Sequence, residues 1–532
     1  MDHHRRDPKL LVLLLATLGT AALSCAVNPV TGERELTLVS TSQEVAIGQQ
    51  QYGPMRQMEG GDFAADPELV RYVQGVGQKL AAHSPRRDLP YEFTVLNNDV
   101  PNAWALPGGK IAVNRGLLLA LESEAQLAAV LGHEIVHAAA RHGAKAMERA
   151  MLAKGALGAV AIATQGSEIG NAAVQGSALG AQLLSQKYGR DAELEADHYG
   201  MEIMVAAGYD PQGAVELQEI FLRLSGGQEP GWLEGLFASH PPSSERLEAN
   251  RQTAARLAES ARGPLVTGAA EYRAAVANLM RTQEAYAASA AGSAALARGD
   301  AKSALAAARK ALAIEPAEPQ FHALASAASL ALGDRSGAER EASRAVELAP
   351  EHYAFALQRA RVRLAGGDGD AALADLEKSL SLLPTADAHF ELGTLLESRG
   401  LTQPAMEHYR VAASGGEAWL ARAGDPLARL ELSRTPERWI TVRPVLDKRG
   451  YLTFELDNRA PFAVTDLSVE ITRPTEGTQA GAPATRSDRF PLPDVLAPGQ
   501  TLRRRTNIGP LTGATGLDGV SVRILSARPA DR

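Results

Sequence analysis

The sequence has very little cysteine, no excess of positive charge and no apolar segment near its start that is long enough to cross a membrane. Cys25 is the only cysteine among the 532 residues, which excludes a disulfide bond within the chain. The apolar run LLVLLLATL at residues 10–18 falls well short of the roughly 20 residues that a membrane-spanning helix needs. The formal net charge is -8, whereas a nucleic-acid surface needs a basic patch, so we expect no DNA or RNA partner.

The start of the chain predicts a bacterial lipoprotein signal peptide at residues 1–24. Three basic residues precede the apolar run, and AALSC follows it and resembles a lipoprotein box, whose cysteine is lipidated and becomes the new N-terminus. An ordinary cleaved signal peptide with an unmodified Cys25 is the alternative. Ala26 is not the aspartate associated with inner-membrane retention. The resemblance therefore implies a periplasmic protein anchored through lipidated Cys25 to the inner leaflet of the outer membrane.

The length of the chain predicts several domains, at about 100 to 200 residues each. Residues 25–262 mix helical signals with the strand signals YEFTVLNN and GGKIAVNRG and predict one α+β domain. Residues 436–530 alternate apolar and polar residues in WITVRPV, YLTFELDN, FAVTDLSVEI and VSVRIL, which predicts an antiparallel β-sandwich. That sandwich carries no catalytic pattern, and we interpret it as a docking or capping module.

Residues 270–418 repeat with a period of 34 residues. The landmarks are Gly-Asp pairs and prolines: Gly299-Asp300, Gly333-Asp334, Gly367-Asp368, Pro316, Pro350 and Pro384. This period and order are typical of tetratricopeptide repeats, each of them a pair of helices joined by a short turn. Such pairs stack into an α-solenoid whose concave surface suits extended peptides, with an inert spacer as the alternative.

The motif LGHEIVHAAARH at residues 131–142 predicts a metal-binding helix. Ser123 and Gln126 indicate a capping box at its start. His133 and His137 lie one helical turn apart, so both can ligate one ion, and Glu134 lies beside them. A catalytic zinc site needs a third protein ligand and one open position.

The segment GRDAELEADHYG at residues 189–200 supplies the third ligand. Glu193 and Asp197 are four residues apart and face one side of a second helix, while Glu195 points elsewhere. We assign Glu193 as the ligand and Asp197 as the acceptor that orients a zinc-bound histidine. A solvated acidic helix face is the ordinary alternative. His198 is a rival ligand, but it lies about 100° around the helix from Asp197.

Five segments together resemble the zinc metalloprotease family that includes HtpX and the CaaX prenyl proteases, in particular its soluble periplasmic branch typified by BepA and LoiP. They are NPVTGERELTLVS, PNAWALPGGKIAVNRGLL, LGHEIVHAAARH, the E-x-E-A-D of GRDAELEADHYG, and ASHPPSSERL. The resemblance implies an α+β multidomain protein with a mainly helical zincin-type (gluzincin) protease domain and one Zn²⁺ per chain. The repeats behind the protease also resemble BepA, whereas the C-terminal sandwich departs from that pattern.

The resemblance also gives roles to residues that spacing alone does not identify. His240 in ASHPPSSERL would occupy the fourth metal position as a gate that substrate displaces, although a histidine before two prolines is more often a loop residue. Arg246 would pair with acidic groups of the site. For His142 we expect packing or hydrogen bonding and no ligation.

Three further expectations concern the surroundings of the site. PGGKIAVN is expected as an edge strand beside the active-site helix, where an extended substrate would add through main-chain hydrogen bonds. Asn102 and Trp104 are expected to line that cleft. For Trp104, a place in the core is the alternative. The apolar segment at residues 151–164 is expected as a helical hairpin over the cleft, with a buried core helix as the alternative.

The motifs predict a zinc metalloendopeptidase, and the family resemblance implies one of the bacterial periplasm that acts in quality control or assembly of outer-membrane proteins. His133, His137 and Glu193 hold the zinc, and Glu134 is the general base. His240 and Tyr199 are both possible oxyanion helpers. The expected partners are unfolded or misassembled outer-membrane proteins and their assembly machinery. The alternatives are a chaperone or assembly scaffold with a largely silent zinc site, and a purely structural zinc site.

Overall fold

The computed structural model describes residues 24–157, 188–225, 239–474, 485–511 and 517–530. The predicted signal peptide, apart from Ser24, and residues 158–164 of the apolar segment lie outside this part of the chain. The chain divides into two compact units, Met1–Gly366 with Ser381–Leu383, and Gly367–Leu380 with Pro384–Arg532. Among the described residues, no helix combines the length and the apolar character that a membrane span requires.

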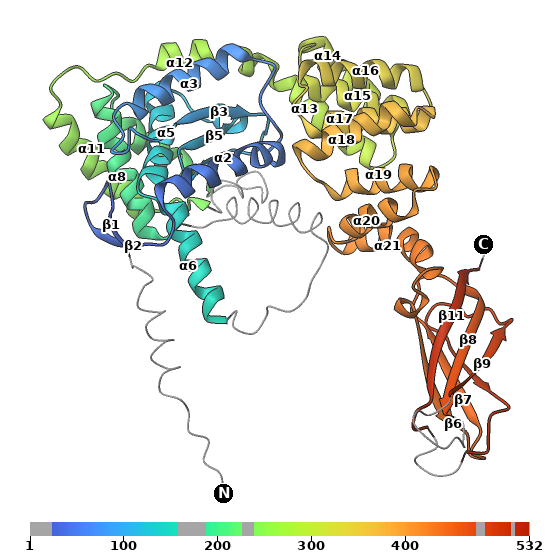
Figure 1. The fold of residues 1–532 in the computed structure, drawn as a ribbon. Coiled ribbons are helices and arrows are strands. Elements are labelled where there is room, and N and C mark those ends of the chain that lie inside the picture. Colours follow the sequence, from blue (N-terminus) through green and yellow to red (C-terminus); the bar gives the residue numbers. More distant parts are fainter. Residues whose placement is uncertain (1–23, 158–187, 226–238, 475–484, 512–516, 531–532) are drawn as a thin grey trace, which may run out of the picture. The chain divides into compact units, whose positions relative to one another are not determined.

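The N-terminal part of the first unit is mainly helical, and its described residues form a two-stranded and a three-stranded sheet (Figure 1). Its strands are β1 (Ser24–Val27), β2 (Arg34–Thr37), β3 (Glu92–Leu96), β4 (Ala103–Leu106) and β5 (Lys110–Asn114). Its helices are α2 (Thr41–Met58), α3 (Pro67–Ala81), α4 (Arg115–Leu118), α5 (Glu124–Ala139), α6 (His142–Leu157), α8 (Arg190–Ala206), α9 (Gln212–Ser225), α11 (Ser244–Ser260) and α12 (Ala269–Ala275).

The three-stranded sheet has the order β3-β5-β4, with β3 parallel and β4 antiparallel to β5. The prediction that PGGKIAVN forms an edge strand is therefore wrong. Every residue of β5 is buried, as expected for a strand paired on both sides. The edge strand that packs against α5 is β4, whose four residues AWAL are too short a run to be recognised as a strand from the sequence.

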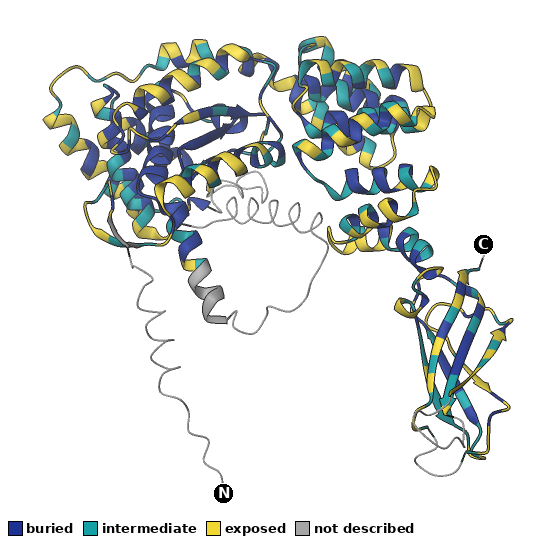
Figure 2. Ribbon diagram, in the orientation of Figure 1, coloured by how far each residue is buried: buried dark blue, intermediate teal, exposed yellow. Residues whose placement is uncertain are grey.

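Helix α5 lies in the middle of this α+β core. All residues from Ala125 to Ala139 are buried, and Figure 2 shows the helix in the colour of buried residues. Such a helix is covered on every side and cannot show the one-sided apolar pattern of a surface helix. Its apolar residues share one core with α3, the sheet, α8 and α9. The motif histidines therefore lie on a helix that the core encloses from Ala125 to Ala139.

The first unit continues into stacked helix pairs. They are α13 (Ala277–Ala297), α14 (Ala301–Ile314), α15 (Pro319–Ala331), α16 (Arg335–Leu348) and α17 (Tyr353–Gly366). The Gly-Asp landmarks form the turns. Gly299 has a φ of 83° after α13, and the Asp300 side chain accepts a hydrogen bond from Ser303 N–H to begin α14. Fully buried Glu318 accepts hydrogen bonds from Asn97 and Tyr286 and so joins the repeats to the sheet domain.

The second unit contains further repeat helices and a β-sandwich. Its helices are α18 (Gly369–Leu382), α19 (Ala386–Ser398), α20 (Thr402–Ala413) and α21 (Glu417–Leu432), followed by a short 3₁₀ helix, η2 (Pro436–Arg438). Its strands are β6 (Ile440–Leu446), β7 (Leu452–Asn458), β8 (Val464–Pro474), β9 (Thr485–Leu492), β10 (Thr501–Arg505) and β11 (Ser521–Pro529). The sheets β10-β7-β6 and β11-β8-β9 enclose one apolar core that also receives Ala428 and Leu432 of α21. The predicted fold class is confirmed.

Candidate metal centre

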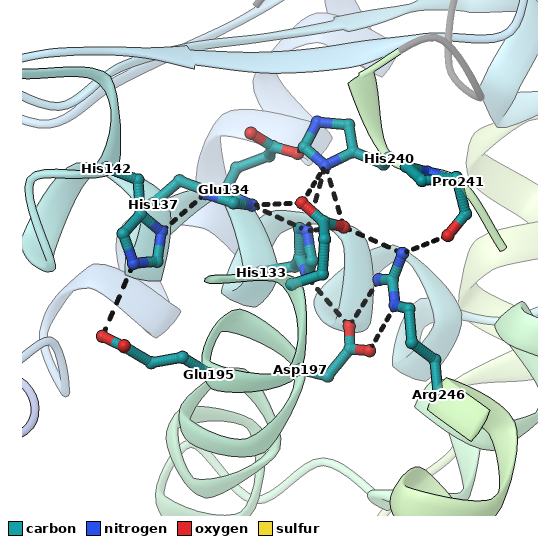
Figure 3. Close-up of polar contacts among 10 residues, drawn as sticks. His133, Glu134, His137, His142, Glu195, Asp197, His240, Pro241 and Arg246 are labelled. Atoms are coloured by element: carbon teal, nitrogen blue, oxygen red, sulfur yellow. Dashed lines mark hydrogen bonds and ion pairs between the residues drawn. The ribbon is translucent and has the colours of Figure 1, made fainter. Parts of the chain in front are cut away.

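Helix α5 presents the motif histidines on one side. The Ser123 side chain accepts a hydrogen bond from Gln126 N–H and caps the helix. The Gln126 side chain accepts a hydrogen bond from Glu122 N–H instead of from the capping residue, so the expected reciprocal capping box does not form. One turn apart, His133 and His137 bring their Nε2 atoms to 2.9 Å from each other (Figure 3).

Helix α8 brings two carboxylates to the same place. Glu193 lies in its first turn, with Oε2 at 3.5 Å from His133 Nε2 and Oε1 at 3.4 Å from His137 Nε2. Asp197 follows one turn later and lies 2.9 Å from His133 Nδ1. His133 thus faces Glu193 with one ring nitrogen and Asp197 with the other. The predicted convergence of one carboxylate with both histidines is confirmed.

A pair of glycines allows α5 and α8 to approach closely. A Cβ atom on Gly132 would lie 3.1 Å from Gly200 O, and a Cβ atom on Gly200 would lie 3.1 Å from His133 N. These spacings are tighter than ordinary side-chain contacts. Gly132 directly precedes His133, and Gly200 lies three residues after Asp197, so the point of closest approach is at the site itself.

The loop after residue 238 and helix α11 complete the group. His240 is buried, and its Nδ1 lies 3.1 Å from Glu193 Oε1 and 3.3 Å from His133 Nε2. Its Nε2 lies 3.6 Å from Glu134 Oε1. On α11, buried Arg246 donates hydrogen bonds to both carboxylate oxygens of Asp197 and pairs with Glu193 at 2.8 Å. Figure 3 shows these side chains converging from three segments of the chain.

The donor set fits a zinc ion. Four residues, His133, His137, Glu193 and His240, each offer one ligand atom, and these atoms lie within 4.8 Å of one another. Two imidazoles and one carboxylate are a common catalytic zinc set, and tetrahedral zinc with bonds of about 2.0 to 2.2 Å holds its ligand atoms about 3.4 Å apart. The distances from Glu193 to His133 Nε2 and His137 Nε2, 3.5 and 3.4 Å, agree with that spacing. The Nε2 atoms of His133 and His137 are close enough for one cation to lie between their lone pairs.

Comparison with known proteins agrees with this geometry. Residues 67–254 match the family model described as Peptidase family M48. This part of the chain is an M48 peptidase domain. The matched range contains both metal-binding helices and His240, Arg246 and the sheet.

Curated relatives of the M48 domain are proteases. The chain is 30% identical over 274 residues to the Beta-barrel assembly-enhancing protease of Escherichia coli (strain K12), covering 48% of this chain and 54% of that protein. It is 32% identical over 223 residues to the Mitochondrial metalloendopeptidase OMA1 of Schizosaccharomyces pombe (strain 972 / ATCC 24843), covering 41% and 63%. The chain thus spans about half the length of the first relative. Among solved structures, a thermophilic tetratricopeptide protein of Thermus thermophilus is 19% identical, with coverage of 41% of this chain and 98% of that chain and a TM-score of 0.26.

The charged side chains around the metal position shift one another's pKa values. Burial acts to lower the pKa of Arg246, but Asp197 and Glu193 outweigh it and raise that pKa. Burial alone would raise the pKa of Asp197, yet the Arg246 guanidinium and His133 hold it below its usual value. Burial raises the pKa of Glu134, although His240 and His133 oppose the shift. Glu134 is therefore a more basic carboxylate than an exposed one, as suits a group that accepts a proton.

The structure brings together all seven predicted site residues of the M48 domain: His133, Glu134, His137, Glu193, Asp197, His240 and Arg246. It does not bring the alternative candidates, His198 and Tyr199, to the metal group. His198 pairs with Glu202 and lies 3.4 Å from Thr253 Oγ1, away from the metal group. Tyr199 packs against the apolar core. Trp104 is buried in a small core cluster with Tyr52 and does not line the pocket beside Glu134.

Two features of the site were missed from the sequence. The Tyr188 ring stacks on the His137 ring with centroids 4.1 Å apart and lies 5.6 Å from the ring of His240. Tyr188 directly precedes the GRDAELEADHYG segment, and that position was the only available signal. His142 contacts His137 and also faces Glu195, a pairing that the spacing of the two motifs does not reveal.

Proposed function

We propose that this chain is a zinc-dependent endopeptidase of the bacterial periplasm that acts on unfolded or misassembled outer-membrane proteins. The observation that carries the proposal is Glu134 beside the donor group of His133, His137 and Glu193. Its Oε2 atom is buried and has no hydrogen-bond partner among the described residues. A structural zinc site has no need for such an unsatisfied carboxylate, whereas a general base needs a free oxygen.

The side chains have distinct tasks in peptide-bond hydrolysis. A zinc ion at the donor group would supply Lewis acidity that polarises the scissile carbonyl and lowers the pKa of water. Glu134 accepts a proton from the attacking water and returns it to the departing amine. Asp197 accepts a hydrogen bond from His133 Nδ1 and fixes its orientation. Arg246 pairs with both Asp197 and Glu193, and its positive charge offsets one of these two buried negative charges.

The surroundings of Glu134 offer a place for substrate. Among the described residues, β4 pairs only with β5, so an extended peptide would add to β4 rather than to β5. A pocket beside Glu134 is lined by apolar side chains, including Met201, Leu217 and Phe221. We propose that a small apolar side chain of the substrate enters it. His240 also lines this pocket and must move before a substrate carbonyl approaches the metal.

The cellular setting is part of the same proposal. The lipoprotein-like AALSC before the protease domain supports anchoring through Cys25, and the domain at residues 25–262 would then face the periplasm. A relative that is 30% identical is named for enhancing β-barrel assembly, which supports outer-membrane proteins as substrates. The repeats at residues 270–418 would hold extended segments of those proteins or of the assembly machinery.

One observation favours a second candidate function. His240 lies within ligand distance of the metal group, so a site closed by it would be silent, and the chain would act as an assembly scaffold. The two functions differ in their need for Glu134. The test is complementation of cells that lack this protein by the Glu134→Gln variant. Complementation is expected if the chain acts as a scaffold, and no complementation is expected if it acts as a protease.

The proposed activity is tested with the purified full chain and an unfolded, casein-like substrate. We expect cleavage that chelation abolishes and added zinc restores, and we expect Glu134→Gln to keep its zinc and lose activity by roughly 10²- to 10⁴-fold. Full cleavage by Glu134→Gln would overturn the mechanism. The same inactive variant, expressed in cells, should capture outer-membrane proteins as trapped substrates.

A further inference from the structure

The histidine after the metal motif contacts a metal ligand directly. His142 is the first residue of α6 and is buried, and its Nδ1 lies 2.8 Å from Nδ1 of His137. The two ring centroids are 4.9 Å apart with an angle of 70° between the planes, which is an edge contact through the nitrogens and not a stack. His142 is absent from the group of residues that converge on the metal position.

The two nitrogens of His137 face different partners. Nε2 is the atom near Glu193 and His133, so it is the ligating nitrogen and must be unprotonated when it ligates. The single proton of a neutral imidazole is then on Nδ1, which donates to His142 Nδ1. His142 Nδ1 must therefore be an acceptor, and the proton of His142 is on its Nε2.

A carboxylate lies where this arrangement requires one. Glu195 Oε1 lies 3.5 Å from His142 Nε2. That oxygen is buried and makes no hydrogen bond with any described residue, so a proton on His142 Nε2 would face an acceptor that is otherwise unsatisfied. Each contact thus has one donor and one acceptor: His137 Nδ1–H donates to His142 Nδ1, and His142 Nε2–H faces Glu195. This leaves Nε2 of His137 without a proton and free to bind the metal.

The backbone turn before His142 holds it against His137. Arg141 has a φ of 63°, a left-handed conformation that a non-glycine residue adopts only when its surroundings hold it there. Its guanidinium is buried in an ion pair with Glu44 and donates to Val39 O. This turn separates α5 from α6 and directly precedes His142, whose ring contacts His137 of α5.

We propose that His142 is a positioning residue for the metal centre: it accepts the Nδ1 proton of His137, fixes the ligating tautomer of that histidine, and is itself held by Glu195. Metal-bound histidines usually make this contact with a carboxylate or a carbonyl oxygen. Here His133 has a carboxylate partner, Asp197, while His137 has an imidazole. The inference rests on the proposed function, because it takes His137 as a zinc ligand.

The test separates an acceptor at this position from simple filling of space. His142→Asn places a carbonyl oxygen near the site of Nδ1, whereas His142→Leu has similar bulk and no acceptor. Zinc affinity is measured by chelator competition, and ligand geometry by the visible spectrum of the cobalt-substituted full chain. We expect His142→Leu to weaken zinc binding by about 10- to 100-fold and to alter the cobalt spectrum. His142→Asn should restore most of the affinity.

Controls keep the outcome interpretable. His198→Leu changes a histidine on α8 outside the metal group and should leave affinity and spectrum unchanged. If His142→Leu does not fold, Glu195→Ala provides the second test, with weaker zinc binding as the expected result. Wild-type affinity and spectrum in His142→Leu, equal losses in the Asn and Leu variants, or wild-type affinity in Glu195→Ala would overturn the inference. A wild-type chain that binds no zinc would instead overturn the proposed function.

Discussion

Arg246 donates two hydrogen bonds to Asp197, from Nε to Oδ2 and from Nη2 to Oδ1, both at 2.8 Å. This bidentate pair joins α11 to α8 and leaves Asp197 Oδ1 at 2.9 Å from His133 Nδ1. The orientation of a metal-facing histidine is therefore fixed from the third helix of the site. Such a pair is strong because two parallel bonds connect opposite charges in a buried place.

Replacing Asp197 by asparagine tests this support. Asp197→Asn keeps the shape of the side chain and removes its charge, so Arg246 loses a partner and His133 loses its charged acceptor. We expect zinc affinity to fall by about 10- to 100-fold while the fold remains intact. Chelator competition gives the affinity and circular dichroism checks the fold. Unchanged affinity would mean that Asp197 only anchors Arg246.

Removal of His240 tests the gate. Its imidazole lies at 3.1 Å from Glu193 and 3.3 Å from His133 and offers a fourth ligand atom at the metal position. We expect His240→Ala to cleave a casein-like substrate several times faster than the wild type, because that fourth ligand position becomes free. His198→Ala, on α8, is the matched control. An unchanged rate in His240→Ala would show that the histidine does not restrict access.

The glycine contact between α5 and α8 makes a prediction about stability and metal binding together. Gly200→Ala adds a Cβ atom at 3.1 Å from His133 N, so the helices must separate by a few tenths of an ångström. We expect a loss of about 1 to 3 kcal/mol in the free energy of unfolding and weaker zinc binding. Gly75→Ala is the control, because that glycine lies exposed in α3 with open space around it. The control should gain up to about 1 kcal/mol.

His389 predicts how the second unit responds to acid. It occupies the position of Phe321 and Phe355 in the preceding pairs, at intervals of 34 residues, and its Nδ1 lies 2.8 Å from His408 Nδ1. Burial, followed by the charge of His408, lowers the pKa of His389 to about 4. In the unfolded chain His389 takes up a proton near pH 6.5, whereas in the folded chain it does so only at lower pH. Its contribution to the free energy of unfolding is therefore fully present above about pH 6.5 and is lost as the pH falls towards 4.

The variant His389→Phe removes this titration. The free energy of urea unfolding is measured between about pH 7 and pH 4.5 with a probe that reports on the second unit. It should fall more steeply with decreasing pH in the wild type than in His389→Phe. Parallel curves for the two proteins would contradict the assignment.

The sequence predicted the metal ligands better than their surroundings for a physical reason. His133, Glu134 and His137 lie within one helical turn of each other, so helix geometry alone brings them together. Glu193 required a second helix to meet the first, and the requirement for a third zinc ligand supplied that argument. The contact of Gly132 with Gly200 and the ring of Tyr188 over His137 depend on tertiary packing that no local spacing specifies.

The errors in the predicted fold have a similar origin. The order of strands depends on pairing between distant segments, so the position of β5 in the centre of its sheet did not follow from its own residues. Strand β9 was not predicted because its sequence TRSDRFPL is largely exposed and has no clear apolar face. The repeats were recognised because a 34-residue period is a property of the sequence itself.

If α5 and α8 together hold one zinc ion through His133, His137 and Glu193, the zinc must remain with the purified chain. The measurement is the zinc content of the full chain after exhaustive dialysis, beside that of Glu193→Ala. We expect one zinc per chain in the wild type and its loss in Glu193→Ala. A wild-type chain without stoichiometric zinc, or a Glu193→Ala variant that retains all of it, would show that these residues do not form the zinc site.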